Sequence, residues 1–306
     1  MTTFLIILIA ILLDLTIGEL PNKIHPVVLI GNMITFLKNH LTSNNRFTGM
    51  LIALITVFTT VIITGIILTI ADLNIISSII IGSIIFSTTF SIKFLITSVE
   101  KIQKDLSTNL DAARKSVSYL VSRDTKDLTE AEITSATIET LTENITDSII
   151  SPILYGFIFN IPFAMMFRVI NTLDAMLGYK TKELINIGYF SARLDDVLNY
   201  IPARIAGLYV VFAAFCLRYD WKKSYKMLRR DARKTPSPNS GYPMAATAGA
   251  LNIMLVKKDV YKLGDKRNKL TSKQISKAIN ITKVSTLLFI VTLYIINLLI
   301  SLIILG

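Results

Sequence analysis

Four long apolar segments dominate the pattern of hydrophobic and polar positions along the chain. They cover residues 4–20, 49–71, 75–96 and 284–305, and the first contains Asp14. A helix needs about 17 to 25 apolar residues to cross a hydrocarbon core about 30 Å thick. The pattern therefore predicts four transmembrane helices.

Two shorter apolar runs, 149–167 and 205–217, are less regular. Pro152, Asn160 and Pro162 interrupt the first run, and Pro202 precedes the second. Irregular backbone is tolerated at membrane depth where protein buries it. We therefore expect two re-entrant or interfacial helical segments, with full crossing by both runs as the alternative.

The polar stretches 97–148 and 218–283 predict cytoplasmic helical insertions. In the first, Thr129 and Glu132 have the spacing of a capping box, which starts a helix that can run to Pro152. The second carries 17 Lys and Arg but only four Asp. Such an excess of positive charge in loops favours the cytoplasmic side of a membrane.

Composition changes the picture only in detail. Of the 306 residues, 52% are hydrophobic and 17% are charged, which is typical of an integral membrane protein. The net charge of +11 lies mainly in loops beside apolar segments, so it argues against nucleic-acid binding. A single cysteine, Cys216, excludes an intrachain disulfide. We expect one all-α, polytopic helical membrane domain over residues 1–306. The loop at Asp72 and both termini should lie outside the cell. The first apolar segment should be retained as a membrane anchor.

Acidic residues line one face of the helix expected after residue 129. At about 100° per residue, Glu132, Glu139, Glu143 and Asp147 share a face opposite the apolar one, so this face is expected to point away from the packing surface. Carboxylates one turn apart suit Mg²⁺ that also binds phosphate oxygens. A solvated acidic face is the alternative.

The string NTLDAMLGYK places Asn171 and Asp174 three residues apart on one helical face. Gly178 then predicts the end of the helix, and Lys180 follows as a flexible cation. Spacing alone allows either metal or phosphate contact or simple helix capping.

The string SARLDDVLNYIPARI supplies two acids and two arginines. Asp195 and Asp196 diverge by about 100° on a helix, so at most one faces a given site. Arg193 and Arg204 could clamp a phosphate or a carboxylate, or pair with neighbouring acids.

The string TPSPNSGYPMAATAGAL combines a tight loop with a helix that starts at Pro243 and contains small residues. Loop amides before a helix N-terminus can bind an anion, although the small residues could instead mark close helix packing. His25 is a lone histidine, which is more often a structural hydrogen-bonding group than a base.

Five strings in order resemble the adenosylcobinamide-phosphate synthase family of cobalamin biosynthesis. They are LLDLTIGELPNKIHPVVLIGNMI, IETLTENITDSIISPILY, FRVINTLDAMLGYK, ARLDDVLNYIPARI and DARKTPSPNSGYPMAATAGAL. The resemblance implies an enzyme of the cell membrane whose active site faces the cytoplasm. It would use ATP and Mg²⁺ to join a carboxylate of adenosylcobyric acid to the amine of (R)-1-amino-2-propanol or its O-phosphate. Its partners would be these substrates, membrane lipid and possible other membrane enzymes of late cobalamin assembly.

With this resemblance, the site residues fall into three groups. The catalytic candidates are Asp174, Asp195, Asp196 and Lys180. The metal candidates are Glu139, Glu143 and Asp147. The substrate- or phosphate-binding candidates are His25, Asn144, Asn171, Arg193, Arg204, Ser237, Asn239, Ser240 and Gly241. Asp174 is also expected to assist the metal, and the choice of base between Asp195 and Asp196 stays open.

Two other classes of membrane protein remain as alternatives. An intramembrane prenyl- or phosphoalcohol transferase would also use acids with Mg²⁺, but DDVLN lacks the final acid of the usual Asp-rich motif. A small-molecule permease would fit the broken helices, but it would normally show two corresponding halves.

Overall fold

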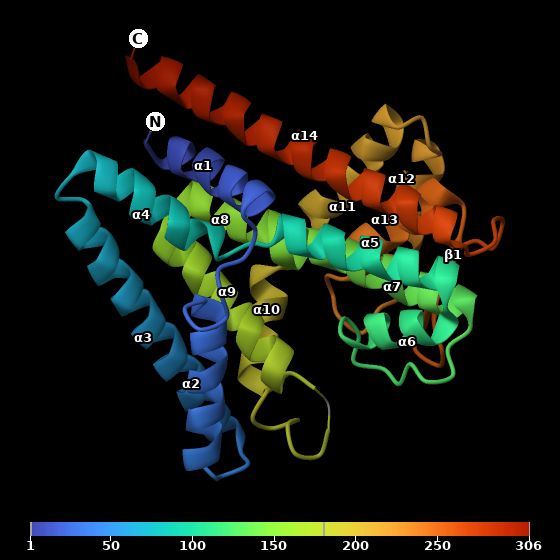
Figure 1. Cartoon of the computed structure of the whole chain (residues 1–306), viewed down its shortest axis with the longest axis horizontal. Coiled ribbons are helices and arrows are strands. Elements are labelled where there is room, and N and C mark those ends of the chain that lie inside the picture. The colour runs from blue at the N-terminus through green and yellow to red at the C-terminus, as the bar shows by residue number, and fades with distance from the viewer. Residues whose placement is uncertain (1, 180, 306) are drawn as a thin grey trace. The chain divides into compact units, whose positions relative to one another are not determined.

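The structure is a computed structural model that describes residues 2–179 and 181–305. The chain folds into two compact units. Unit 1 comprises Met1–Ile92, Ser151–Asn199 and Asn297–Gly306, and unit 2 comprises Lys93–Ile150 and Tyr200–Ile296. Almost all secondary structure in both units is helical, which confirms the predicted fold class (Figure 1).

Unit 1 is organised around the helix α9. Its helices are α1 (Thr2–Thr16), α2 (Pro26–His40), α3 (Arg46–Ala71), α4 (Ile75–Ser87), α8 (Ser151–Phe159), α9 (Ile161–Leu177) and α10 (Tyr189–Leu198). The helices α2, α3, α4, α8 and α10 all pack against α9. Its buried residues Val169 and Leu173 share an apolar cluster with Ile34 of α2 and Ile52 of α3. The helix that carries Asn171 and Asp174 is therefore held in place by packing against five neighbouring helices.

The predicted interruption of the run 149–167 is confirmed at Asn160. This residue has a φ of 70°, which ends α8 and starts α9. Pro162 is the second residue of α9, where a missing backbone N–H removes no helical hydrogen bond, and Pro152 lies two residues after a π-helical turn that ends at Ile150.

Unit 2 contains the remaining elements. They are α5 (Ile92–Thr108), α6 (Leu110–Ser118), α7 (Glu130–Ile145), a π-helical turn η1 (Thr146–Ile150), α11 (Tyr200–Cys216), α12 (Trp221–Asp231), α13 (Gly241–Leu251), β1 (Met254–Lys257), β2 (Tyr261–Gly264) and most of α14 (Ser272–Leu305). The almost entirely buried α13 packs against α7, α11, α12 and both strands. A Cβ added at Gly249 would lie 2.5 Å from the Lys223 carbonyl oxygen, so the small residues of α13 do serve close helix packing.

Three helices are long and apolar enough to cross a membrane: α3, the α4–α5 pair over Ile75–Thr108, and α14. The consecutive helices α10 and α11 meet at a bend of 48°, and together they would make a fourth crossing if they form one span. The first predicted span is shorter than expected, because α1 ends at Thr16 and Gly18 turns the chain with a φ of 90°. A polytopic membrane protein is confirmed, but α1 by itself is a shorter apolar helix.

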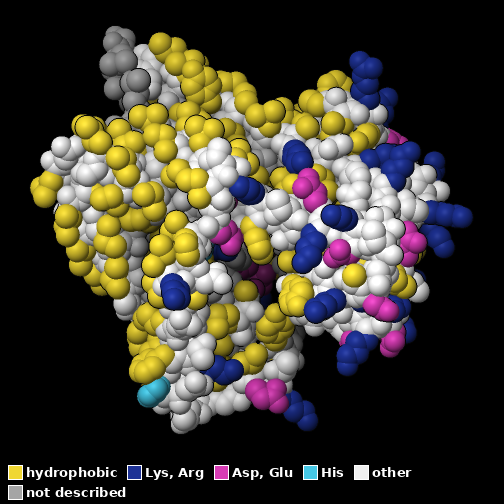
Figure 2. All heavy atoms as spheres, viewed as in Figure 1, with side chains coloured by type: hydrophobic (Ala, Val, Ile, Leu, Met, Phe, Trp, Pro, Cys, Tyr) yellow, Lys and Arg dark blue, Asp and Glu magenta, His cyan; other side chains and the backbone are white. Residues whose placement is uncertain are grey.

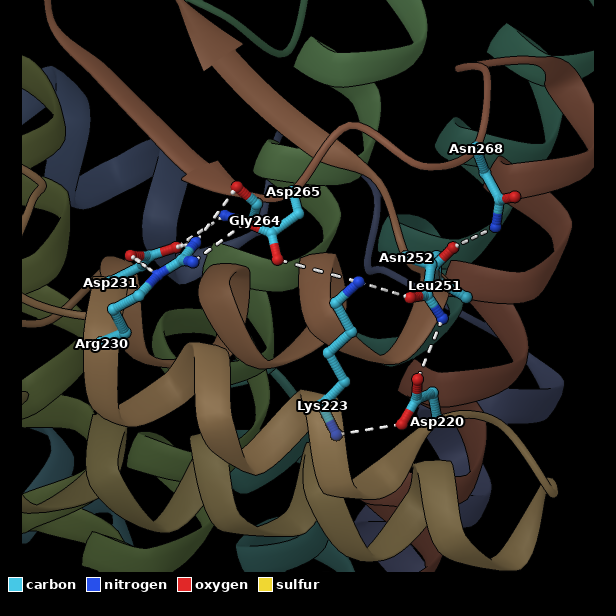
Figure 3. Close-up of polar contacts among 9 residues, drawn as sticks. All are labelled: Asp220, Lys223, Arg230, Asp231, Leu251, Asn252, Gly264, Asp265 and Asn268. Carbon is cyan, nitrogen blue, oxygen red and sulfur yellow. Dashed lines mark hydrogen bonds and ion pairs between the residues drawn. The ribbon is translucent and has the colours of Figure 1, made fainter.

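An antiparallel hairpin of β1 and β2 was not predicted from the sequence. Its turn contains Asp259 with a φ of 57°, and Leu255 pairs with Leu263 across the strands. Asp231, at the end of α12, ties the hairpin down (Figure 3). Its carboxylate accepts hydrogen bonds from Arg230 and from the backbone N–H of Gly264 (2.8 Å).

The groups that surround Asp231 explain why this buried carboxylate stays ionised. Burial alone would raise the pKa of Asp231, but bonds from Arg230, Lys234 and the Gly264 amide lower it to about 2. Asp231 therefore stays ionised at neutral pH and joins α12 to β2.

Candidate functional site

In unit 2, the helix that carries the acidic residues starts as predicted. The side chain of Thr129 caps α7, and Glu132 reaches back to the Thr129 backbone N–H at 2.9 Å. These hydrogen bonds from the Thr129 backbone and side chain lower the pKa of Glu132. The capping box is therefore confirmed.

The helix reaches Pro152 as predicted, but it is not α-helical throughout. The α-helix α7 ends at Ile145 and gives way to the π-helical turn η1, which contains Asp147, before α8 begins at Ser151. A π turn widens the helix by one residue, so Asp147 no longer has the α-helical spacing to Glu143. Such turns occur often at functional sites.

Glu139 is the main correction to the predicted acidic face. Its side chain is buried, with 2% exposed, whereas the face was expected to point away from the packing surface. It accepts hydrogen bonds from Ser135 (2.6 Å) and Tyr261 (2.8 Å) and pairs with Arg123. Both carboxylate oxygens are therefore held by donors from three segments of unit 2, which compensates the cost of burying the charge.

Tyr261 was missed at the sequence level because it lies far along the chain, on the unexpected hairpin. Burial, followed by the charge of Glu139, raises its pKa well above the ordinary value, so its hydroxyl is a permanent donor. The negative charge of Glu143 adds to the same effect, which places Glu143 within electrostatic reach of this tyrosine.

Glu143, Asn144 and Asp147 are only partly buried, unlike Glu139. The side chain of Asn144 donates to the Thr140 carbonyl (2.9 Å) and accepts from the Ser148 hydroxyl (2.7 Å). These bonds fix the junction of α7 and η1. Within the described residues, no group of three or more His, Cys, Asp or Glu side chains forms a ready metal site. Two partly exposed carboxylates nevertheless have the chemistry that Mg²⁺ requires, since this ion is usually bound by one or two carboxylates plus substrate phosphates and water.

The loop of Ser237, Asn239 and Ser240 lies beside Arg204. One guanidinium nitrogen of Arg204 donates to the Asn239 side-chain oxygen at 3.2 Å. The guanidinium carbon lies 3.3 Å from the Tyr200 ring centroid and 4.2 Å from that of Tyr242. The Asn239 backbone N–H donates to the Ser237 hydroxyl, so one loop amide is already used within the loop.

The start of the helix after this loop differs from prediction. The helix α13 begins at Gly241, so Pro243 is its third residue rather than its first. The φ of Gly241 is not positive, so this glycine does not serve a left-handed backbone conformation. Gly241 is needed instead because an added Cβ would lie 2.1 Å from the Ala232 carbonyl oxygen.

In unit 1, Asn171 and Asp195 form part of a hydrogen-bonded chain. The Asn171 amide donates to Asp195 Oδ1 at 3.2 Å, and the Asn199 amide donates to Asp195 Oδ2 at 3.0 Å. Ser151 in turn donates to the Asn199 side-chain oxygen at 2.6 Å. Asn199 and Ser151 were not predicted, and together they fix the orientation of the Asp195 carboxylate.

Asp174 lies one turn after Asn171 on α9, as predicted. Gly178 follows the last helical residue, Leu177, which confirms it as the end of the helix. A Cβ added at Gly178 would lie 2.0 Å from Asp174 Oδ1, so this glycine also leaves room for the carboxylate. Lys180 lies outside the described residues.

The other predicted side chains of unit 1 have clear local contacts. The Arg193 guanidinium lies 5.6 Å from the Tyr189 ring centroid. His25 caps α2 by accepting a hydrogen bond from the Val27 backbone N–H, which confirms its structural role. Burial lowers the pKa of His25. The negative charge of Glu19 raises this pKa and the positive charge of Arg168 lowers it further. His25 is therefore neutral at pH 7.

Comparison with known proteins identifies the family. The family model described as CobD/Cbib protein matches residues 7–290, which include every candidate site residue. The chain belongs to the CobD/Cbib family. This family takes part in cobalamin biosynthesis.

Relatives of this CobD/Cbib chain occur in archaea and bacteria. "Probable cobalamin biosynthesis protein CobD" of Methanothermobacter thermautotrophicus is 44% identical over 285 residues, which is 93% of this chain and 94% of the relative. The protein of the same name in Methanocaldococcus jannaschii is 42% identical over 85% of this chain and 88% of its own length. "Cobalamin biosynthesis protein CobD" of Leptospira interrogans is 36% identical over 94% of this chain and 96% of its own length. No solved structure is significantly similar to the chain.

Proposed function

We propose that this membrane protein catalyses an ATP-dependent step of cobalamin biosynthesis, the formation of an amide bond. The substrates would be adenosylcobyric acid and (R)-1-amino-2-propanol or its O-phosphate. The observation that carries this proposal is a pair of partly exposed carboxylates, Glu143 at the end of α7 and Asp147 in the π-helical turn η1, in a member of this family. One or two carboxylates, together with phosphate oxygens and water, are the usual ligands of Mg²⁺.

The chemistry requires activation of the acid. A carboxylate is a poor electrophile, so we propose that its oxygen first takes the γ-phosphoryl group of ATP, releasing ADP and giving an acyl phosphate. The amine then attacks the carbonyl carbon, the C–O bond to phosphate breaks, and inorganic phosphate leaves. The attacking ammonium must first lose a proton, for which Asp195 and Asp196 remain the proposed bases.

Glu143 and Asp147 would hold Mg²⁺, which when bound neutralises charge on the phosphates. Glu139 has a different part in this proposal. Both of its oxygens accept hydrogen bonds from protein side chains. Glu139 therefore holds Arg123 and Tyr261 against α7, the helix that also carries Glu143.

The test is a coupled assay on the purified protein in detergent or proteoliposomes. ADP formation should depend strictly on both adenosylcobyric acid and the amine, with one amide product formed per ADP. ADP release that ignores the corrinoid, or an amide product without ATP consumption, would contradict the proposal. A prenyl- or phosphoalcohol transferase and a permease should not couple these substrates.

A further inference from the structure

We propose that α12 is an interfacial helix whose exposed face binds the headgroups of anionic phospholipids. The inference concerns unit 2 alone and does not depend on the proposed reaction. Its first basis is the amphipathic character of α12. Ser224, Met227 and Leu228 are buried against the rest of unit 2, whereas aromatic and cationic residues are exposed.

The cations of α12 fall into two groups. Arg230 and Lys223 contact Asp265, and Arg230 also pairs with Asp231, so this group serves the fold (Figure 3). The other group, Lys222, Lys226 and Arg229, is exposed. No ion pair joins any of these three to a carboxylate within the described part of the chain, and Lys and Arg gather on the visible surface of unit 2 (Figure 2).

Helical spacing places these three cations in one stripe, because they occupy positions i, i+4 and i+7. Trp221 and Tyr225 form the adjacent stripe and are 40% and 44% exposed. Lysine or arginine beside tryptophan and tyrosine is the combination expected where a helix lies at a membrane surface. The exposed face therefore matches an anionic lipid surface in both charge and polarity.

The preceding helix supplies the apolar continuation of this surface. Leu208, Phe212 and Phe215 are exposed along one side of α11. The ring of Phe215 lies 5.9 Å from that of Trp221, edge to face. The apolar side of α11 thus leads directly into the aromatic stripe of α12, as it would at a boundary between hydrocarbon and headgroups.

Contacts between α11 and α14 show where along these helices the boundary between hydrocarbon and headgroups lies. Tyr209 of α11 contacts Ser285 and Phe289, whereas Tyr219 lies beside Lys277, so the two helices are antiparallel. Lys283 is the last cation before the apolar part of α14. At about 1.5 Å per residue, Lys277 lies roughly 9 Å beyond it, comparable to the headgroup layer outside the hydrocarbon core. Trp221 comes two residues after Tyr219 and therefore lies near this level.

The chain contains a built-in reporter, because Trp221 is its single tryptophan. The protein is reconstituted in equimolar phosphatidylglycerol and phosphatidylcholine, with only one of the two lipids brominated in each sample. Quenching of Trp221 then gives the relative association of each lipid with this position. We expect Trp221 to prefer phosphatidylglycerol by a factor of at least about five. This factor corresponds to the binding free energy that one lysine or arginine contributes near an anionic surface.

The test variant combines Lys222→Gln, Lys226→Gln and Arg229→Gln. It should lose the preference while phosphatidylcholine still quenches Trp221, which shows that α12 keeps its place. The matched control, Lys262→Gln with Lys266→Gln and Lys269→Gln, removes the same charge from exposed positions elsewhere in unit 2 and should keep the preference.

Three outcomes of the quenching measurement would overturn the proposal. They are no quenching by either brominated lipid, equal quenching by both in the unmodified protein, and a preference that survives in the test variant. Soluble glycerol phosphate should leave the preference unchanged. If it abolished the preference, the cations would form a site for a free phosphate rather than for lipid.

Discussion

Glu143 and Asp147 are partly exposed, whereas the neighbouring Glu139 is buried, and this difference in burial separates their expected roles. We expect Glu143→Gln and Asp147→Asn each to lower amide synthesis by at least about a hundredfold, the scale of a lost contact to transition-state charge. Steady-state rates at saturating Mg²⁺ measure the effect. Glu130→Gln, an exposed acid in the first turn of α7, is the control, and near-normal turnover in both test variants would refute the metal assignment.

Glu139 should behave as a structural acid. Glu139→Gln leaves Arg123 without its anionic partner, and breaking a buried pair costs about 3 to 5 kcal/mol, less here because Arg123 is partly exposed. Tyr261→Phe removes one hydrogen bond and should cost about 1 to 3 kcal/mol. Thermal unfolding in detergent measures both. Unchanged stability of Glu139→Gln, combined with a weakened response to Mg²⁺, would instead support the original metal assignment.

At the scale of elements, Asp231 joins α12 to the hairpin and makes this contact sensitive to acid. Its folded pKa is about 2, below the ordinary 3.8. A lowered folded pKa contributes stability that is present above the unfolded value and is lost as the pH falls through the folded one. The contribution should therefore disappear between about pH 4 and pH 2.

Hydrogen exchange of the Gly264 amide, which donates to Asp231, reports on this contact. We expect its protection to fall steeply over that pH range, after correction for intrinsic exchange. Asp231→Asn should reduce protection at neutral pH and flatten the pH dependence. An unaltered pH profile in Asp231→Asn would show that another group controls the hairpin.

At the scale of the whole molecule, the orientation of the segment after α9 stays a prediction. Lys182 lies in this segment and is exposed. With Cys216, the chain's single cysteine, replaced by Ser, a Lys182→Cys variant offers one thiol. We expect this thiol to resist a membrane-impermeant maleimide added to intact cells and to react after the cells are opened. Rapid labelling from outside would mean that this segment lies outside the cell, against the predicted cytoplasmic site.

The sequence by itself determined the class of protein and many local features. Long apolar runs specify membrane helices without tertiary information, because their length and composition already meet the demand of the bilayer. The Thr129 capping box, the break near Asn160 and the end of α9 at Gly178 were also predictable, because each depends on residues close in sequence. The same holds for the family, which ordered strings of residues identify.

Only the tertiary structure decided how the candidate residues are buried and which groups they contact. Helical periodicity placed Glu139 on an exposed face, but Tyr261, from a distant hairpin, and Arg123 cover it. The π turn at Asp147 changes the spacing of the carboxylates, and the close approach of the Ala232 carbonyl explains Gly241. In each case the deciding contact joins segments remote in sequence or alters helical geometry through packing, and a local pattern carries no information about such partners.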